Sequence, residues 1–170
     1  AMKISIITAT FNSAKTIKDC LESVNSQNYP DIEHIIIDGM SKDETINIVK
    51  QYPKVRWVSE KDAGIYDAMN KGIKIASGEI IGILNSDDIY FDKEVLLRVA
   101  KAFKDGDIEA CYGDIVYVDR KNMSKVLRRW RSGNISLKGY KKYWAIPHPA
   151  LFVRKSTYEK YGLYDEKYRI

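Results

Sequence analysis

Two adjacent carboxylates, Asp87 and Asp88, are the sharpest pair of chemistry-bearing residues in this chain. They follow Glu79–Leu84, a short apolar run that is typical of a buried strand. Neighbouring carboxylates repel each other unless a cation or hydrogen-bond donors relieve them, and hard divalent ions prefer carboxylate and water oxygens. The pair therefore indicates a metal site. A helix N-cap followed by an acid that the helix dipole favours explains the same two residues equally well.

Three more polar segments follow apolar runs, namely Thr8–Asn12, Asp38-Gly39 and Glu60–Gly64. In open parallel sheets, ligands bind beyond the carboxyl ends of the strands, so we expect all these segments to meet Asn85–Asp88 at one edge. Asp38 is interpreted either as a turn residue before glycine or as an acceptor for a ring N–H of a nucleobase. Thr8–Asn12 is either a strand end with a cap or a backbone edge that lies along the same base.

The elements that must position these segments alternate along the chain. Four apolar runs are predicted to be strands: Lys3–Thr10, Glu33–Ile37, Val55–Ser59 and Glu79–Leu84. Apolar stripes predict helices between them: one opening at Asn12-Ser13, one after Ser41 and Glu44 with their capping-box spacing, one through Ile65–Ala76 and one over Lys93–Phe103. This alternation predicts an α/β fold with a mostly parallel, doubly wound (Rossmann-like) sheet and helices on both faces.

The alternation of predicted strands and helices changes after Gly106. Glu109–Asp119 and Lys125–Trp130 are predicted to be two extended segments around a polar turn, a small antiparallel excursion. Ala150–Arg154 is predicted to be a further strand and Ser156–Tyr161 the start of a short helix. No segment has the composition of a linker, so we expect residues 1–170 to form a single domain.

Composition narrows the class of protein. Apolar residues make up 45% of the chain, too many for a disordered protein. The longest apolar runs have about five residues, whereas a membrane span needs about 20, so neither a transmembrane helix nor a signal peptide is expected. Cys20 and Cys111 lack metal-type spacing and are expected to be small buried hydrophobes in a reducing compartment. The net charge of +5 favours anionic partners. The first strand is followed by neither a Walker loop nor GxGxxG, which argues against a P-loop NTPase and a dinucleotide dehydrogenase.

Four motifs, in this order and spacing, resemble those of the family 2 glycosyltransferases: Thr8-Ala-Thr-Phe-Asn12, Ile37-Asp-Gly-Met-Ser-Lys-Asp-Glu-Thr45, Glu60-Lys-Asp-Ala-Gly-Ile-Tyr-Asp-Ala-Met-Asn-Lys-Gly72 and Leu84-Asn-Ser-Asp-Asp88. The resemblance covers essentially the whole chain. It implies a GT-A fold and an inverting transfer of a sugar from a nucleoside diphosphate, most commonly UDP, with a divalent metal, Mn²⁺ or Mg²⁺. It places the nucleotide-sugar-binding half in residues 2–105 and the start of the acceptor-binding half in residues 106–170.

The resemblance also implies a role for each matching residue. Those expected to bind the donor nucleotide are Thr8, Thr10 and Asn12 beside the nucleobase, Asp38 paired with the base, Asp62, Asn70, Lys71 and Gly72 along the ribose and diphosphate, and Asp87 toward the ribose. Asp88 is expected to face the metal in a DXD-type element. Asn85 stands where such elements often have Asp, so this version carries less negative charge.

The general base that inversion requires is not assigned to a residue of this chain. In similar glycosyltransferases it is an acid in a segment rich in Asp, Glu and Tyr, just beyond a stretch like residues 162–170. Asp165 and Glu166 precede that place and are interpreted as loop carboxylates. We therefore expect the base beyond Ile170, in a longer enzyme of which this sequence is the donor-binding part.

A basic, aromatic stretch suggests a surface partner. Its residues are Lys125, Arg128, Arg129, Trp130, Arg131, Lys138, Tyr140, Lys141, Lys142, Tyr143 and Trp144. It is interpreted as a solvated strand face and mobile loop before a site for anionic lipid or a lipid-linked acceptor; no nucleic acid is expected, because no nucleic-acid motif accompanies it. His148 is either a neighbour of the acceptor site or a residue of a rigid loop.

The leading hypothesis is thus a glycosyltransferase of cell-surface polysaccharide or glycolipid biosynthesis that uses a saccharide or lipid-linked acceptor. It is expected in the cytoplasm, with peripheral contact at the inner face of the membrane. Two other classes remain open. One is a non-catalytic module that binds nucleotide sugars, and the other is a basic surface module that binds lipid or RNA.

Overall fold

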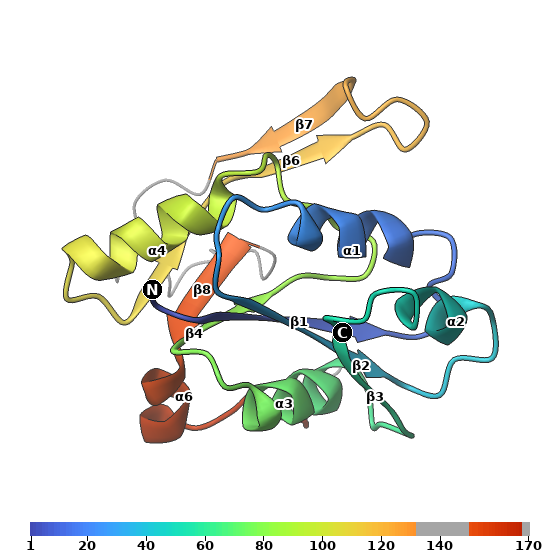
Figure 1. The fold of residues 1–170 in the computed structure, drawn as a ribbon, viewed down its shortest axis with the longest axis horizontal. Coiled ribbons are helices and arrows are strands. Elements are labelled where there is room, and N and C mark those ends of the chain that lie inside the picture. The colour runs from blue at the N-terminus through green and yellow to red at the C-terminus, as the bar shows by residue number, and fades with distance from the viewer. Residues whose placement is uncertain (132–149, 168–170) are drawn as a thin grey trace.

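The computed structural model describes residues 1–131 and 150–167. The main sheet has six strands in the order β3-β2-β1-β4-β8-β5. Its strands are β1 (Ile4–Thr10), β2 (Ile32–Asp38), β3 (Arg56–Ser59), β4 (Ile80–Ile83), β5 (Ala110–Tyr112) and β8 (Leu151–Arg154). The helices are α1 (Ile17–Asn25), α2 (Thr45–Val49), α3 (Ile65–Ile75), α4 (Val95–Asp105) and α6 (Lys155–Tyr161). A two-stranded sheet joins β6 (Ile115–Val118) to β7 (Val126–Trp130), and it rises beyond α1 and α4 in Figure 1.

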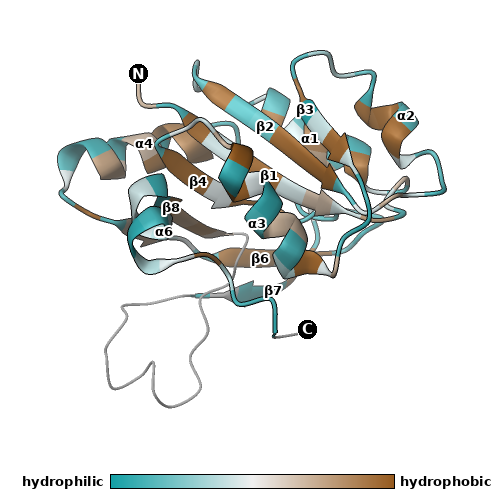
Figure 2. Cartoon of the chain, turned by 90° about the horizontal axis from the view of Figure 1, so that it is seen from below, coloured by the Kyte–Doolittle hydropathy of each residue, from teal (hydrophilic) through white to brown (hydrophobic). Residues whose placement is uncertain are grey.

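The parallel centre of the sheet confirms the sequence expectation. β1 pairs in parallel with β2 on one side and with β4 on the other, and β2 pairs in parallel with β3. The β-branched, apolar residues of β1, β2 and β4 suit strands that are covered on both faces, and most of β2 and β4 is brown in Figure 2. The register places Thr10 beside Asp38 and Asp38 beside Ser59, so three strands end level with one another.

Helices cover both faces of the sheet, as the doubly wound pattern predicts (Figure 1). On one face, Met69 and Ile73 of α3 pack against Ile7 of β1 and its neighbours. On the other face, the apolar sides of α1 and α4 enclose a second cluster with Phe152 of β8, in which Cys20 is fully buried. Cys111 is half-buried, and both cysteines are free. Helices on both faces remove the apolar strands of the sheet from water, which stabilises the domain.

The antiparallel part is divided differently from the expectation. Glu109–Asp119 is not one extended segment, because the chain leaves the main sheet after Tyr112 and starts a separate hairpin at Ile115. β5 lies at the sheet edge and pairs antiparallel with β8, which itself pairs antiparallel with β4. Gly113 marks the break, where its N–H donates to the Ala150 carbonyl at 2.9 Å. The predicted excursion is real, but only β6 and β7 form it.

Two predicted helix starts are wrong. α1 begins at Ile17 rather than at Asn12-Ser13, because Asn12 adopts a left-handed φ of 49° that a helix cannot contain. Ser41 does not cap α2, whose N-cap is Glu44 and has no side-chain cap bond. The Ser41 hydroxyl donates instead to Asp38 at 2.5 Å. A short polar side chain can bond either to the start of a helix or to another side chain, and the Ser41 hydroxyl bonds to the buried carboxylate of Asp38 and not to the start of α2.

His148 lies outside the described residues, as do the members of the basic, aromatic stretch from Lys138 to Trp144. Within residues 1–131 and 150–167, no helix has both the length and the apolar composition of a membrane span.

Replacing Gly72 with alanine tests the contact between α3 and the sheet. A Cβ at Gly72 would clash with Cγ2 of the buried Ile7, so one of them must move. The strain of overpacking, about 1–3 kcal/mol, should exceed the gain in helix propensity, about 1 kcal/mol. We expect Gly72→Ala to lower the free energy of unfolding in urea. Gly113→Ala, where an added Cβ meets nothing within 4 Å, is the control and should change it by less than about 0.5 kcal/mol.

Candidate functional site

The four polar segments meet at one edge of the sheet, as the sequence predicts. The loops after β1 and β4 touch through the hydroxyls of Ser13 and Ser86, whose oxygens are 3.0 Å apart. The loops after β1 and β2 are joined by the Gly39 N–H, which donates to the carbonyl of Thr10 at 3.0 Å. The Glu60 N–H donates to the Asp38 carbonyl at 2.9 Å and brings in the loop after β3. Parallel pairing thus converts four distant stretches of sequence into one surface.

Asp38 is the anchor of this edge. It is fully buried at the end of β2. One carboxylate oxygen accepts from the Ser41 hydroxyl at 2.5 Å, and the other accepts from the Ser41 N–H at 2.9 Å and the Ser59 hydroxyl at 2.7 Å. A buried carboxylate needs such donors, because removing an ion from water without partners costs several kcal/mol. Asp38 is therefore more than the turn residue of an Asp-Gly pair.

A second set of hydrogen bonds fixes the loop after β1 against the loop after β2. Asn12 Oδ1 accepts from the Lys42 N–H at 2.8 Å, and the Asn12 N–H donates to Ser41 Oγ at 2.8 Å. Asp43 Oδ2 accepts from the Ala14 N–H at 3.1 Å. The left-handed backbone of Asn12 is one that Asn tolerates better than most residues. The predicted site residue Asn12 therefore shapes the loop itself while its side chain remains exposed.

The two threonines of the first motif differ in their surroundings. Thr8 is fully buried, and its hydroxyl lies 2.9 Å from Nε2 of His34. Burial lowers the pKa of His34 to about 3, so this histidine stays neutral and serves the core. Thr10 is 5% exposed, and its hydroxyl oxygen is buried without a partner among the residues that the structure describes. An unpartnered polar atom at a strand end fits a ligand group at Thr10 and not at Thr8.

Asp87 and Asp88 lie together at the end of β4. Burial, and to a lesser extent the neighbouring charge of Asp87, raises the pKa of Asp88 to about 6, although a hydrogen bond with Asn85 acts in the opposite direction. Asp87 is exposed. Across residues 1–131 and 150–167 no group of three or more His, Cys, Asp or Glu could enclose a metal. Two adjacent carboxylates nonetheless fit a hard divalent ion that takes its remaining oxygens from a ligand or water.

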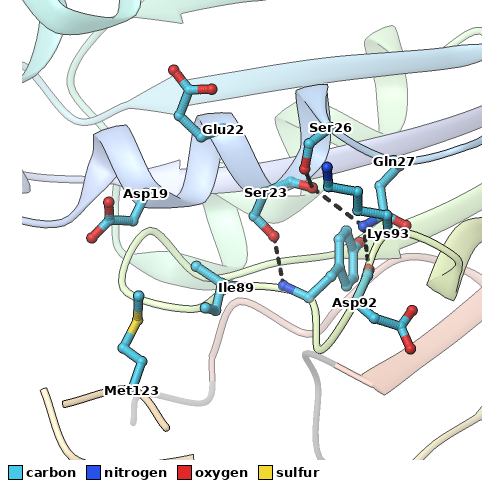
Figure 3. A pocket seen from close by; sticks show the side chains of 10 residues that line it. Asp19, Glu22, Ser23, Ser26, Gln27, Ile89, Asp92, Lys93 and Met123 are labelled. Carbon is cyan, nitrogen blue, oxygen red and sulfur yellow. Dashed lines mark hydrogen bonds between the residues drawn. The ribbon is translucent and has the colours of Figure 1, made fainter.

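The loop that carries Asp87 and Asp88 is held to α1 by hydrogen bonds. The Tyr90 N–H donates to Ser23 Oγ at 2.7 Å, and Gln27 Nε2 donates to the Asp92 carbonyl at 2.7 Å. These contacts line a pocket of about 320 Å³ on the outer side of α1 (Figure 3). None of the predicted site residues lines this pocket. We interpret this pocket as part of the interface through which α1 positions the Asp87-Asp88 loop.

A larger open cleft of about 600 Å³ lies at the carboxyl edge of the sheet. Its lining includes the predicted residues Asn12 and Asp87 together with Asn85. Sequence analysis missed two cations of the lining, Lys15 and Arg120. Lys15 precedes α1, and Arg120 comes from the turn between β6 and β7. Two cations in one cleft with Asp87, the neighbour of Asp88, suit an anionic ligand that also binds a metal.

The third motif lies mostly within the protein. Lys71 forms ion pairs with Glu60 at 3.1 Å and Asp67 at 3.3 Å, and Gly72 packs on Ile7 of the sheet. Asp62 is half-buried against Gly39, and its Oδ1 accepts from the Gly64 N–H at 3.1 Å. Asn70 is 2% exposed and binds the segment after α6. Of these four predicted donor-binding residues, Asp62 lies beside the Asp38 loop, while the other three make contacts internal to the protein.

A sheet of this order, with four strand ends gathered at one edge, has the GT-A architecture. The model of the family "Glycosyl transferase family 2" matches residues 5–160, and the chain belongs to this family.

Curated relatives extend over the full chain. It is 32% identical over 176 residues to a "PGL/p-HBAD biosynthesis glycosyltransferase" of Mycobacterium bovis (strain BCG / Pasteur 1173P2), an alignment that covers 100% of this chain and 66% of that protein. It is 33% identical over 147 residues to a chondroitin synthase of Escherichia coli, which covers 84% of this chain and 20% of the synthase. The chain thus spans 66% of the length of the first of these relatives.

Solved structures share the fold at lower identity. A mannosyltransferase from Pyrobaculum calidifontis in complex with GDP-Man and Mn²⁺ superposes with a TM-score of 0.73 at 18% identity, over 97% of this chain and 48% of that one. S. aureus TarS 1-349 in complex with UDP-GlcNAc superposes with a TM-score of 0.70 at 22% identity, over 94% of this chain and 47% of the other. These neighbours confirm the GT-A architecture.

The pKa of Asp88 predicts a pH dependence of stability. Its folded pKa of about 6 lies above the ordinary value of 3.8, so ionised Asp88 opposes folding above pH 6, and stability rises as pH falls from 6 toward 4. With EDTA present, Asp88→Asn should stabilise the protein at pH 8 by on the order of 1 kcal/mol, a figure discounted for solvent screening. Urea titrations should show this gain shrinking toward pH 4.

Asp107→Asn, at an exposed position after α4, is the matched control for that comparison. It should change the free energy of unfolding by less than about 0.5 kcal/mol. A gain at Asp88 that is the same at pH 8 and pH 4 would contradict the assigned cause.

Proposed function

We propose that this chain binds a nucleoside-diphosphate sugar, most simply a UDP-sugar, and contributes to its transfer with inversion to an acceptor hydroxyl. The observation that carries the proposal is the cleft itself. It joins Asp87, the neighbour of Asp88 after β4, to the cations Lys15 and Arg120, and Asp43 of the loop after β2 also lines it. Membership of glycosyl transferase family 2 supports the reaction type. The related S. aureus protein solved with UDP-GlcNAc supports the donor.

The residues in and around the cleft have distinct tasks in this proposal. Asp88 would hold a divalent metal, Mn²⁺ or Mg²⁺, and Asp87 would face the ribose. The metal would act as a Lewis acid that stabilises the negative charge of the departing diphosphate. Lys15 and Arg120 would neutralise further charge on the same phosphates. Thr10 and Asp38 would receive the nucleobase at the end of β1 and β2.

Donor binding can be divided between Asp38 and Asp88 by calorimetry with UDP. Asp38→Asn should weaken UDP binding with or without Mn²⁺, by about 1–3 kcal/mol, because a buried acceptor is lost. Asp88→Ala should remove mainly the part of the affinity that Mn²⁺ adds. Titrations with and without Mn²⁺ give both quantities for each protein.

Two variants serve as controls for the UDP titrations. Asp19→Ala changes a carboxylate of the smaller pocket and should leave UDP affinity unchanged. Ser59→Ala removes one donor to Asp38 while it keeps the carboxylate, so it measures how much of the Asp38→Asn effect is loosening of the loop. Equal losses with and without Mn²⁺ in both aspartate variants would refute the division of roles. Sugar transfer then separates a transferase from a module that only binds the donor.

We further propose that the β6–β7 hairpin contacts an anionic membrane that carries a lipid-linked acceptor, on the cytoplasmic side. Its exposed apolar side chains include Met123, which is 54% exposed, and Leu127, which is 59% exposed. The exposed cations of the same hairpin are Arg120, Lys121, Lys125, Arg128, Arg129 and Arg131. Apolar side chains among several cations suit the boundary between headgroups and acyl chains. The relative of Mycobacterium bovis, named for glycolipid biosynthesis, is consistent with such an acceptor.

Vesicle sedimentation tests the hairpin. The protein should bind vesicles that contain phosphatidylglycerol, not vesicles of phosphatidylcholine alone, and salt should weaken the binding. The double variant Arg128→Glu and Arg129→Glu should lose at least about 30-fold in affinity, since each cation near the surface contributes about 1 kcal/mol. Lys101→Glu with Lys104→Glu makes the same change of charge on α4 and should have a smaller effect. Equal losses in both double variants would show that net charge, not the hairpin, determines binding.

A further inference from the structure

Asn70 joins α3 to the chain that follows α6. Its Nδ2 donates to the Tyr164 carbonyl at 2.9 Å and to Glu166 Oε1 at 3.0 Å. Its Oδ1 accepts from the Tyr164 N–H at 2.9 Å. One side chain thus pairs with both backbone groups of Tyr164 and with the carboxylate two residues later. These contacts span 94 and 96 residues of sequence.

Aromatic rings reinforce this junction. The ring of Tyr164 stacks on Tyr66 of α3 with a centroid distance of 5.4 Å and lies 6.0 Å from the ring of Tyr158 on α6. Burial raises the pKa of Tyr164, so its hydroxyl remains protonated at neutral pH. Stacked pairs add to the free energy gained from burial. Tyr66 directly follows Ile65, which lines the cleft, so the junction lies next to the candidate donor site.

The amide of Asn70 has little capacity left for a nucleotide. An Asn side chain offers two N–H donors and one carbonyl oxygen. Both donors and the oxygen are already paired within the protein. With 2% of the residue exposed, a ligand could bind the amide only by displacing the segment. Packing and hydrogen bonding together therefore indicate that Asn70 binds other parts of the protein and not a ligand.

We infer that Asn70 is a positioning residue: it holds residues 162–167 on α3 beside the donor cleft and does not itself bind the donor. This inference rests on the proposed function for the identity of the cleft. The residues that Asn70 holds include two carboxylates, Asp165 and Glu166, next to a site where an acceptor must approach the donor. Anchoring them to α3 keeps donor-binding and downstream residues in one fixed geometry, which transfer between two bound substrates requires.

Amide hydrogen exchange tests the anchor directly, because the Tyr164 N–H is one of the three bonds. Asn70→Ala should raise the exchange rate at Tyr164 by at least about 10-fold, which corresponds to the loss of a buried hydrogen-bonding partner. The affinity for UDP with Mn²⁺ should change by less than about 3-fold. Asn47→Ala removes an exposed amide of α2 that donates to Glu44, and it should leave the exchange rate at Tyr164 unchanged.

A charge swap separates positioning from a general loss of structure. Asn70→Asp keeps an acceptor for the Tyr164 N–H, but it places a carboxylate against Glu166. Protection at Tyr164 should therefore fall at pH 8 and partly return near pH 5, where two close carboxyls can share a proton. Adding Glu166→Gln places an amide donor at position 166 opposite the new carboxylate at position 70. The hydrogen bond between the two side chains then forms in the opposite direction, so protection at pH 8 should return. A variant that merely unfolds would regain nothing from the second change.

The outcomes are distinguishable from those of the proposed function. Unchanged exchange at Tyr164 in Asn70→Ala, with UDP affinity reduced more than about 10-fold, would overturn the inference and make Asn70 a donor ligand. Unchanged exchange with unchanged affinity would also overturn it and leave the aromatic contacts as the anchor. If the unaltered protein does not bind UDP, the proposed function fails, but the exchange comparison still decides whether Asn70 positions the segment.

Discussion

The buried carboxylate of Asp38 is the interaction on which the ligand edge depends. It gathers the hydroxyl and N–H of Ser41 and the hydroxyl of Ser59 around one charged group that water does not reach. Removing any one of these donors would leave part of the buried carboxylate unsatisfied. The loop after β2 must therefore fold back over its own strand, and through Ser41 it also holds the backbone of Asn12. The shape of the cleft follows from this requirement.

The sequence predicts the sheet well because its signals are local and repeated. The apolar, β-branched runs that become β1, β2 and β4 are short and bounded by polar segments, which specifies buried strands and the edge where their ends meet. The errors lie at the helix starts. Ser41 and Glu44 have the spacing of a cap, but a capping pattern cannot reveal that a buried Asp38 competes for the same hydroxyl. Asn12 fails as a helix start for a similar reason, since its amide binds Lys42 of another loop.

The acidic residues of the candidate site could be predicted from the sequence, but its cations could not. Burial is the largest cause of the raised pKa of Asp88 and depends on the fold, whereas the smaller contribution of Asp87 can be anticipated because the two residues are adjacent in sequence. Arg120 reaches the cleft from a hairpin outside the four motifs, and no local pattern connects it with β1 or β4. Asn70 shows the opposite case, because the motif identifies the residue while its hydrogen bonds to Tyr164 depend on the fold of the last described segment. Long-range partners require the folded topology.

The antiparallel insertion of β8 has a consequence for how the chain folds. β8 fills the position between β4 and β5, although it comes after both in the chain. During synthesis, the apolar edge of β4 emerges long before the strand that covers it, and β5 has no partner in the main sheet until β8 arrives. Closing so long a loop is slow, and an uncovered strand edge is a template for association between chains. The outer half of the sheet is therefore where a nascent or refolding chain is most exposed to aggregation.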